Sequence, residues 1–241
     1  MRKNRVLLKL SGEALAGDDG KSPFNAETMH QIAVEISAAH EKSFEIAVVV
    51  GGGNVFRGVS GAGIGMERVT ADQIGMLATI QNGLWLRDMI ERKFGIRTRL
   101  MSGLNCPGVA EPYIKRRAVR HLEKNRVVIF VGGTGNPYCT TDYAAALRAN
   151  EIEASLLAKA TNVDGIYDKD PKKHADAKLL HSVSYQRCLD DQLGVMDTEA
   201  FALCRDQRMP IRVFSLKEPG TITAVLTGGD VGTLVSTTEQ A

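Results

Sequence analysis

The chain has 241 residues, of which 44% are hydrophobic and 24% are charged, and its formal net charge is +2. This composition suits an α/β protein with a sizeable core, and we expect one domain over residues 1–241. The small net charge does not favour a nucleic-acid surface, so we expect no direct contact with nucleic acid. Because no run of about 18 apolar residues occurs, we expect no membrane-spanning helix and no membrane partner.

The cysteines and the N-terminus indicate a cytoplasmic location. Lys9 and Glu13 interrupt the apolar part of the basic N-terminal segment, which is unlike a signal peptide. The cysteines form no C-x-x-C pair and have no histidine at zinc-ligand spacing, so we interpret them as reduced thiols. They are Cys106, Cys139, Cys188 and Cys204.

Short apolar runs alternate with longer helix-like segments along the chain. Several of the runs show no polar alternation, which is typical of strands buried on both faces. The alternation predicts a mainly parallel sheet with helices on both sides. We expect strands at 5–10, 45–50, 97–102, 126–131, 153–160 and 211–214, and helices at 25–42, 70–93, 111–124, 140–150 and 196–208.

The helix predicted at 70–93 has apolar residues on more than one face. Thr70 and Gln73 match a capping box, with Asp72 in the first turn. Two interpretations stay open: the helix is sandwiched inside its own domain, or its outer face is buried by another subunit.

Ligands of open α/β sheets bind at the carboxyl ends of the strands, and the first predicted strand ends in "KLSGEA". A buried Lys9 would be costly unless it met an anion, whereas at an edge position it would point into solvent. Gly12 allows close backbone approach, and the loop N–H groups can hold phosphate oxygens.

The second predicted strand ends in "GGGNVFRG", which matches neither of the two common phosphate loops. Gly51 to Gly53 can turn backbone amides toward an anion, and the Arg57 guanidinium suits phosphate. The alternative is a tight turn followed by a surface arginine.

A third glycine-rich segment, "GGTGNPYCTTD", follows the strand predicted at 126–131. It adds hydrogen-bonding side chains, and Thr140 or Thr141 is expected to cap the next helix, whose N-terminus favours an anion. The alternative is a Gly-Asn-Pro turn with a helix cap alone.

The segment "KATNVDGIYDKDP" offers a turn at Asp164-Gly165, Tyr167 to stack on a base, and Asp170 to accept from a ribose hydroxyl. Together, these strand ends predict more phosphate sites than one mononucleotide needs. They favour phosphoryl transfer between two phosphorylated ligands, which depends on positioning and charge neutralisation. No Ser-His-Asp or Cys-His signature is present, which fits phosphoryl transfer because that reaction needs no strong nucleophile on the protein.

Seven motifs in order along the chain resemble the bacterial uridylate (UMP) kinases of the amino-acid kinase fold family. They are "KLSGEAL", "GGGNVFRG", "GMLAT", "GTGNPYCTTD", "KATNVDGIYDKDP", "VMDTEAF" and "PIRVF". The resemblance implies a three-layer α/β/α sandwich with a central, mainly parallel sheet. It also implies Mg²⁺-dependent transfer of the ATP γ-phosphoryl group to UMP, but it names no metal ligands.

The resemblance assigns residues to two nucleotide sites. For ATP it implies Lys9, Leu10, Ser11, Gly12, Gly53, Arg57, Thr161, Tyr167 and Asp170. For UMP it implies Gly52, Asp72, Thr134, Gly135, Asn136, Pro137, Tyr138, Cys139, Thr140 and Thr141. We expect Lys9, Arg57 and Asp142 to act in catalysis.

Three roles stay open in the sequence. Asp142 can orient the cationic groups or assist the phosphoryl acceptor. Lys159 is either a second charge stabiliser or a solvent-facing side chain. Asp197 is either a site residue or the acid that starts the helix in "MDTEAF".

The resemblance also implies a homohexamer built from dimers, with GTP and UTP as effectors. The loop "AGDDGKSPFN" departs from the shorter glycine-and-phenylalanine turn of related sequences. One rival function is a non-catalytic nucleotide-binding or oxyanion-storage protein on the same fold. Another is a transcription-linked sensor that acts through partner proteins in addition to catalysis.

Overall fold

The computed structural model describes residues 4–16, 22–56, 65–169, 171, 173–174, 176–194 and 196–238. Its strands are β1 (Arg5–Leu10), β2 (Glu45–Val50), β3 (Thr98–Ser102), β4 (Glu111–Pro112), β5 (Val127–Val131), β6 (Leu156–Thr161), β7 (Ile166–Tyr167), β8 (Leu179–Leu180), β9 (Ser182–Ser184), β10 (Ile211–Ser215) and β11 (Thr233–Ser236). Its helices are η1 (Gly12–Leu15, a 3₁₀ turn), α1 (Ala26–Glu41), α3 (Arg68–Phe94), α4 (Lys115–Glu123), α5 (Thr141–Glu151), α6 (Tyr185–Asp190), α7 (Thr198–Asp206) and α8 (Thr221–Leu226).

Nine of the strands form one central sheet in the order β4-β3-β5-β2-β1-β6-β10-β11-β9. Neighbouring strands run parallel, except that β10 and β11 are antiparallel. Strands β7 and β8 form a separate antiparallel hairpin. The predicted mainly parallel sheet is therefore confirmed.

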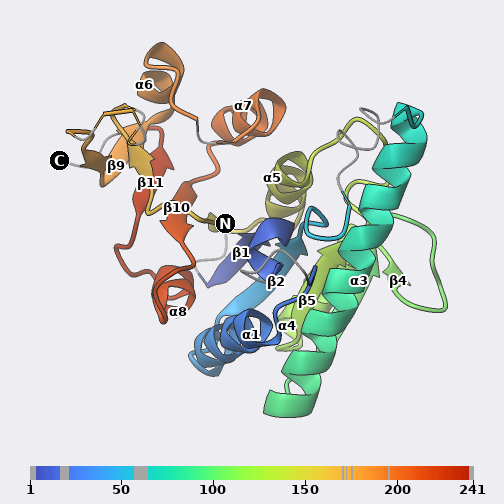
Figure 1. Ribbon diagram of the computed structural model, residues 1–241. Coiled ribbons are helices and arrows are strands. Elements are labelled where there is room, and N and C mark those ends of the chain that lie inside the picture. Colours follow the sequence, from blue (N-terminus) through green and yellow to red (C-terminus); the bar gives the residue numbers. More distant parts are fainter. Residues whose placement is uncertain are drawn as a thin grey trace.

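Helices cover both faces of this sheet. Alternate side chains of β1 enter different cores: Leu8 packs on the face covered by α1, α3 and α8, and Leu7 packs on the face covered by α4, α5 and α7. Figure 1 shows α1, α3 and α8 in front of the sheet and α4 behind it. Both faces of β1 are buried, which explains its near-continuous apolar sequence.

The six longer strands lie close to the predicted positions, with one clear difference at β6. The sequence predicted a strand from residue 153, but β6 begins at Leu156. Glu153 has a positive φ of 59°, and the Ala154 N–H returns to the carbonyl of Ala149. These residues therefore close the end of α5 before the strand begins.

The start of α3 differs from the prediction. The helix begins at Arg68 with Glu67 at the N-cap, so the predicted capping box of Thr70 and Gln73 is wrong. The Thr70 hydroxyl instead donates to the Glu67 carboxylate at 2.8 Å. Asp72 consequently lies beyond the first turn of the helix.

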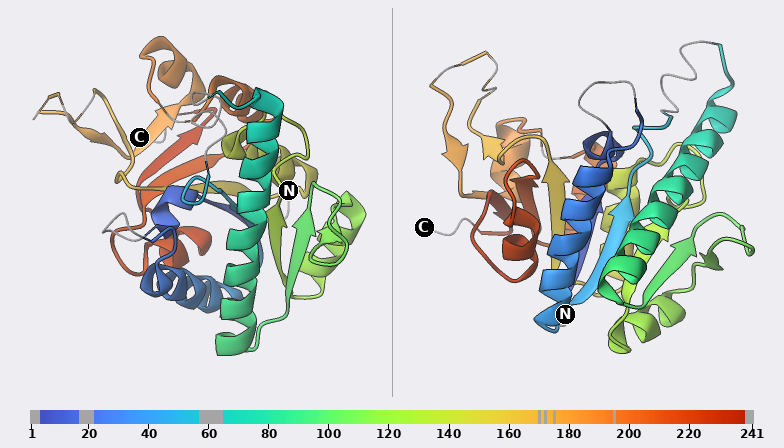
Figure 2. Two further views of the ribbon diagram at one scale, coloured as in Figure 1. Left: turned by 45° about the vertical axis from the view of Figure 1, so that its right-hand side comes forward. Right: turned by 60° about the horizontal axis from the view of Figure 1, so that its bottom comes forward.

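The carboxyl-terminal ends of the central strands lie between two projections. The β7–β8 hairpin rises on one side and the N-terminal end of α3 on the other, as the right-hand view of Figure 2 shows. Within the described ranges, no helix combines the length and apolar character that crossing a bilayer requires.

Candidate active site

Three charged side chains meet at the carboxyl ends of the central strands. Lys9 on β1 and Lys159 on β6 are paired in the parallel register, so both point to the same face of the sheet. The Asp142 carboxylate lies between them, with Oδ1 2.8 Å from Lys9 Nζ and Oδ2 2.6 Å from Lys159 Nζ. The three side chains are only 10–14% exposed, so this is a largely buried ion triad.

The two lysines resolve alternatives that the sequence left open. Because β1 lies in the middle of the sheet, Lys9 is 8% exposed, and its placement at a solvent-facing edge is wrong. Lys159 likewise points toward Asp142 rather than into solvent. A pattern of apolar runs could not decide this, because the face of each lysine depends on the register between β1 and β6.

The start of α5 delivers Asp142 to the triad. Thr140 is the N-cap residue, and its hydroxyl accepts from the Tyr143 N–H at 3.0 Å, as predicted for one of the two threonines. Asp142 follows in the first turn, where a carboxylate complements the helix dipole. The cap thereby fixes the position of the acid relative to the strands.

Burial and charge act in opposite directions on the triad. Burial alone raises the pKa of Asp142, but the charges of Lys9 and Lys159 outweigh it and hold that pKa below the ordinary value. Burial lowers the pKa of Lys159, and the Asp142 charge only partly offsets this effect. The triad therefore places two lysine side chains on one ionised carboxylate at the strand ends.

The glycines near β1 and β2 allow two backbone segments to pack against each other. An added Cβ at Gly12 would lie 2.4 Å from the Gly53 nitrogen, and one at Gly51 would lie 2.7 Å from the Gly12 nitrogen. An added Cβ at Gly52 would lie 2.8 Å from the Ala78 Cβ on α3. These close approaches, rather than turn formation alone, require glycine at all three positions.

The loop after β5 bends sharply through left-handed residues. Gly132, Gly133 and Gly135 have φ values of 68°, 56° and 84°, and Tyr138 has a φ of 65°. The Thr134 hydroxyl accepts from the Asn136 N–H at 3.1 Å, which closes a local turn. The loop thus returns toward α3 before α5 begins.

A cavity of about 540 Å³ lies between these loops and α3. It brings together seven of the predicted UMP and ATP residues: Gly52, Gly53, Asp72, Asn136, Cys139, Thr140 and Thr141. Thr134 lines a different cavity of about 370 Å³, next to Tyr113, Arg148 and Glu151. Gly135 and Pro137 line neither cavity, and Tyr138 is 68% exposed.

Asp72 links α3 to the loop after β5. Its carboxylate accepts from Arg68 Nε, with both oxygens at 2.9 Å, and from the Tyr138 N–H at 2.8 Å. The Arg68 guanidinium also lies 5.3 Å from the centre of the Tyr138 ring. Sequence reasoning missed Arg68, although its i,i+4 spacing to Asp72 was the available signal.

The predicted ATP residues are spread over a second region. The Leu10 side chain is fully buried, while its carbonyl accepts from the Gly51 N–H at 2.9 Å. Ser11 starts η1, and Thr161 ends β6, where its hydroxyl donates to the Val163 carbonyl at 2.9 Å. Tyr167 lines a cavity of about 440 Å³.

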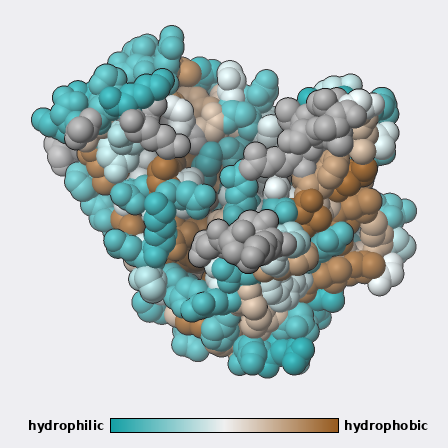
Figure 3. Space-filling model, viewed as in Figure 1, coloured by the Kyte–Doolittle hydropathy of each residue, from teal (hydrophilic) through white to brown (hydrophobic). Residues whose placement is uncertain are grey.

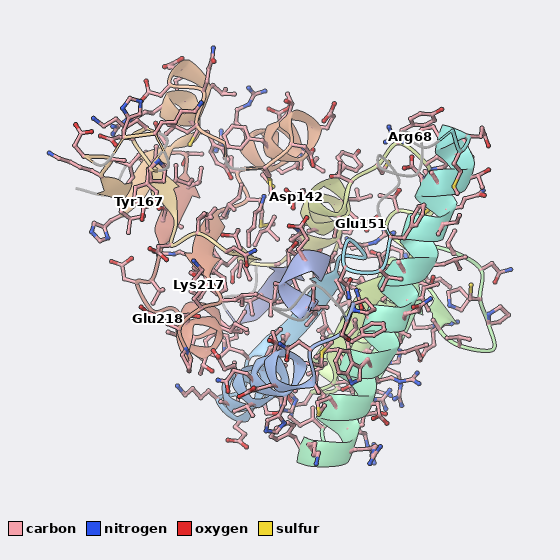
Figure 4. All side chains as sticks on the ribbon, in the orientation of Figure 1. Arg68, Asp142, Glu151, Tyr167, Lys217 and Glu218 are labelled. Atoms are coloured by element: carbon pink, nitrogen blue, oxygen red, sulfur yellow. The ribbon has the colours of Figure 1, made fainter. Side chains whose placement is uncertain are left out.

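Figure 4 shows the Arg68 and Tyr167 labels on opposite sides of Asp142, so the two regions flank the triad. The predicted residues Arg57 and Asp170 lie outside the described residues. The structure therefore adds nothing to either assignment.

Asp197 starts α7, which confirms the helix-start interpretation. One carboxylate oxygen accepts from the Ala200 N–H at 2.9 Å, and the other accepts from the Thr140 hydroxyl. Since Thr140 also caps α5, these contacts join the starts of two helices beside the triad.

Comparisons with known proteins show the family of this chain. A model of the amino acid kinase family matches residues 4–215. A uridylate kinase of Cereibacter sphaeroides (strain ATCC 17029 / ATH 2.4.9) is 55% identical over 224 residues, which are 93% of this chain and 90% of that protein. One from Xanthomonas axonopodis pv. citri (strain 306) is 52% identical over 231 residues, 96% of this chain and 95% of that protein.

Solved structures extend the likeness to the whole fold. A UMP kinase from Bacillus anthracis has a TM-score of 0.94 at 40% identity, and the match covers 99% of each chain. A UMP kinase from Ureaplasma parvum has a TM-score of 0.91 at 36% identity, covering 98% of this chain and 100% of that one. The chain belongs to the amino acid kinase family and, within it, to the uridylate kinases.

Proposed function

We propose that the protein transfers the γ-phosphoryl group of ATP to UMP, giving ADP and UDP. The family and its uridylate kinase relatives support this activity. The observation that carries it in this chain is the Lys9–Asp142–Lys159 triad, which places two cations beside glycine loops at the strand ends. Such a site neutralises charge and positions two phosphorylated ligands, which is what phosphoryl transfer requires.

In the proposed reaction, an oxygen of the UMP phosphate attacks the γ-phosphorus of ATP. The bond between that phosphorus and the bridging oxygen breaks, and the electron pair leaves with ADP. Lys9 and Lys159 stabilise the charge on the transferring group, while Asp142 holds the two ammonium groups in place. Asp142 does not act as a base here, because both of its oxygens face ammonium groups and its pKa is held low.

We assign UMP to the cavity of about 540 Å³ that Asp72, Gly52 and Thr140 line. ATP would extend from the Lys9–Gly12 loop toward Thr161 and Tyr167 on the other side of the triad. Arg57 and Asp170 stay predictions for the ATP site. Arg68 is added as a candidate for the UMP side, because it lines the same cavity and holds Asp72.

Mg²⁺ is the metal we propose, and the chemistry of the cleft fits an ion that arrives with the nucleotide. Among the described residues, no group of three or more His, Cys, Asp or Glu side chains is arranged to hold a metal. Mg²⁺ commonly takes most of its ligands from phosphates and water, with one or two carboxylates. Both oxygens of Asp142 face ammonium groups, so the ion would be held mainly by the ATP phosphates, whose charge it would reduce.

We further propose a homohexamer built from dimers, GTP and UTP as effectors, and a cytoplasmic location. The oligomer is supported by the apolar side chain of Leu77 on α3, which is 47% exposed. Figure 3 shows hydrophobic residues gathered over this side of the molecule. The location is supported by four free cysteines, which a reducing compartment maintains.

A coupled ADP-release assay with ATP and Mg²⁺ tests the activity. UMP, CMP, AMP, aspartate and acetylglutamate are offered as acceptors, and we expect turnover with UMP. Turnover with an amino acid and none with UMP would contradict the proposal. Binding of ATP without turnover of any monophosphate would instead support the storage alternative.

A further inference from the structure

Helix α3 carries two buried polar side chains on the face that meets the sheet. Thr79 is 5% exposed and Asn82 is fully buried. They stand three residues apart, so they lie on the same side of the helix. Burying such groups is costly unless they form hydrogen bonds, so their partners indicate why these residue types are present.

Asn82 binds the loop after β2. Its side-chain amide donates to the Gly51 carbonyl and to Asn54 Oδ1, each at 2.7 Å. Asn54 donates back to Asn82 Oδ1 at 3.1 Å, and also to the Pro23 carbonyl at 2.7 Å. One helical side chain therefore holds both ends of the Gly51–Asn54 turn.

Thr79 binds the loop after β5. Its hydroxyl donates to the Met76 carbonyl and accepts from the Gly132 N–H, each at 2.7 Å. Gly132 is the first left-handed residue of that loop, with a φ of 68°. The hydroxyl therefore fixes the point at which the chain leaves β5.

Helix α3 packs closely against both loops. An added Cβ at Gly83 would lie 2.3 Å from Val131 Cγ1, and one at Gly52 would lie 3.0 Å from the Thr79 nitrogen. The helix thus contacts the ends of the neighbouring strands β2 and β5 directly. Thr79 lines the cavity assigned to UMP, but its hydroxyl is used in the bonds to Met76 and Gly132. Replacing Thr79 with valine therefore releases a loop while keeping the shape of the cavity wall, and Asn82 lines none of the cavities described above.

We propose that Thr79 and Asn82 are positioning residues, which set the separation of the two glycine loops so that donor and acceptor phosphates meet in line. This inference rests on the proposed function, which places Gly52 and the loop after β5 on the UMP side and Gly53 on the ATP side. Misplacing reacting groups by about 1 Å can cost about 100-fold in rate. The effect should fall on kcat rather than on the affinity for either nucleotide.

The first test compares Thr79→Val with Thr79→Ser. Valine keeps the shape but removes the hydroxyl, whereas serine keeps the hydroxyl. We expect Thr79→Val to lower kcat about 10- to 100-fold, with KM for UMP and ATP within about threefold. Thr79→Ser should retain kcat within about threefold, because the bond to Gly132 can still form.

Thr98→Val is the matched control, because Thr98 is also buried and its hydroxyl donates to the Ile96 carbonyl at 3.1 Å. It lies at the start of β3, the opposite end of the sheet from the triad. Thermal unfolding is measured for every variant. If Thr79→Val and Thr98→Val lose similar stability and show equal kcat, Thr79 is only structural and the proposal fails.

Asn82→Ala and the double variant with Thr79→Val provide a second test. Because both residues act through one helix, their effects on kcat should be less than additive. If Asn82→Ala does not fold, the proposal is tested by the comparison of Thr79→Val with Thr79→Ser and Thr98→Val alone. Wild-type turnover of UMP is measured alongside, so failure of the proposed function is distinguished from failure of this inference.

Discussion

At the residue scale, the buried charges of Lys9, Asp142 and Lys159 are tolerated because each has a partner of opposite charge. Removing Asp142 would leave Lys9 and Lys159 buried with like charges side by side, a change that typically costs about 3–5 kcal/mol.

The two pKa shifts have opposite consequences for stability. The lowered pKa of Asp142 stabilises the fold above the unfolded value of about 3.9, and this contribution is lost as pH falls through the folded pKa.

The lowered pKa of Lys159 acts in the other direction. Between its folded pKa and the unfolded value of about 10.4, the unfolded chain binds more protons, so stability from this group rises with pH. Charged Lys159 is therefore costly to the fold at neutral pH. A side chain retained at such a cost is consistent with a role in the reaction.

This cost leads to a prediction for the pH dependence of turnover. We expect kcat to decline on the alkaline side below the ordinary lysine pKa, because deprotonated Lys159 no longer neutralises the transferring group. In Lys159→Arg, whose guanidinium stays charged, that decline should move to higher pH. The measurement is kcat at saturating ATP and UMP over about pH 7 to 11.

Lys115→Arg serves as the control, since Lys115 is half exposed and pairs with Glu153 at the surface. Its pH profile should match the wild type. If kcat of Lys159→Arg declines at the same alkaline pH as the wild type, then Lys159 is not the group whose deprotonation lowers turnover.

At the element scale, the contact between the loop after β2 and helix α3 depends on having no side chain at Gly52. We predict that Gly52→Ala lowers the free energy of unfolding by about 1–3 kcal/mol, because the methyl group overlaps Ala78 and the Gly75 carbonyl. KM for UMP should rise, since Gly52 lines the cavity assigned to UMP. Thermal unfolding and steady-state kinetics check both effects.

Gly108→Ala is the matched control for this substitution. An added Cβ at Gly108 meets no atom within 4 Å, so the variant should be neutral or more stable by about 0.4–1 kcal/mol. Gly52→Ala with the same stability and KM as Gly108→Ala would show that the backbone approach at Gly52 is unimportant.

The elements also show where sequence patterns succeed. Helix α1 was predicted within one residue at each end, because Asn25 caps it and a long apolar pattern follows. Helices α6 and α8 were missed, since each has six residues and is shorter than the window that reveals helical periodicity. The predicted helix over 111–124 begins only at Lys115, because Glu111 and Pro112 pair with β3 as strand β4.

At the scale of the whole molecule, the outer face of α3 is the surface that we expect to form a subunit contact. Leu77 is 47% exposed, whereas Leu84, Trp85 and Met89 are partly buried against the core of the same chain. We predict that Leu77→Asp shifts the protein from the proposed homohexamer to smaller species, because the carboxylate would be buried in the subunit contact. Sedimentation velocity at several concentrations measures the change.

Leu189→Asp on α6 is the control, since Leu189 is 40% exposed and α6 lies on the other side of the molecule from α3 (Figure 1). It should sediment like the wild type. A monomeric wild-type protein, or unchanged assembly of Leu77→Asp, would count against α3 as the subunit contact.

The alternating strands and helices, the glycine loops and the family resemblance could all be predicted from the amino-acid sequence, because each depends on residues close together in the chain. Which side chains contact each other became clear only from the folded structure. Lys9, Asp142 and Lys159 converge through the register of β1 with β6, and Asn82 reaches Gly51 through the packing of α3. Such contacts depend on the packing of segments far apart in the sequence, which no local pattern of residues encodes.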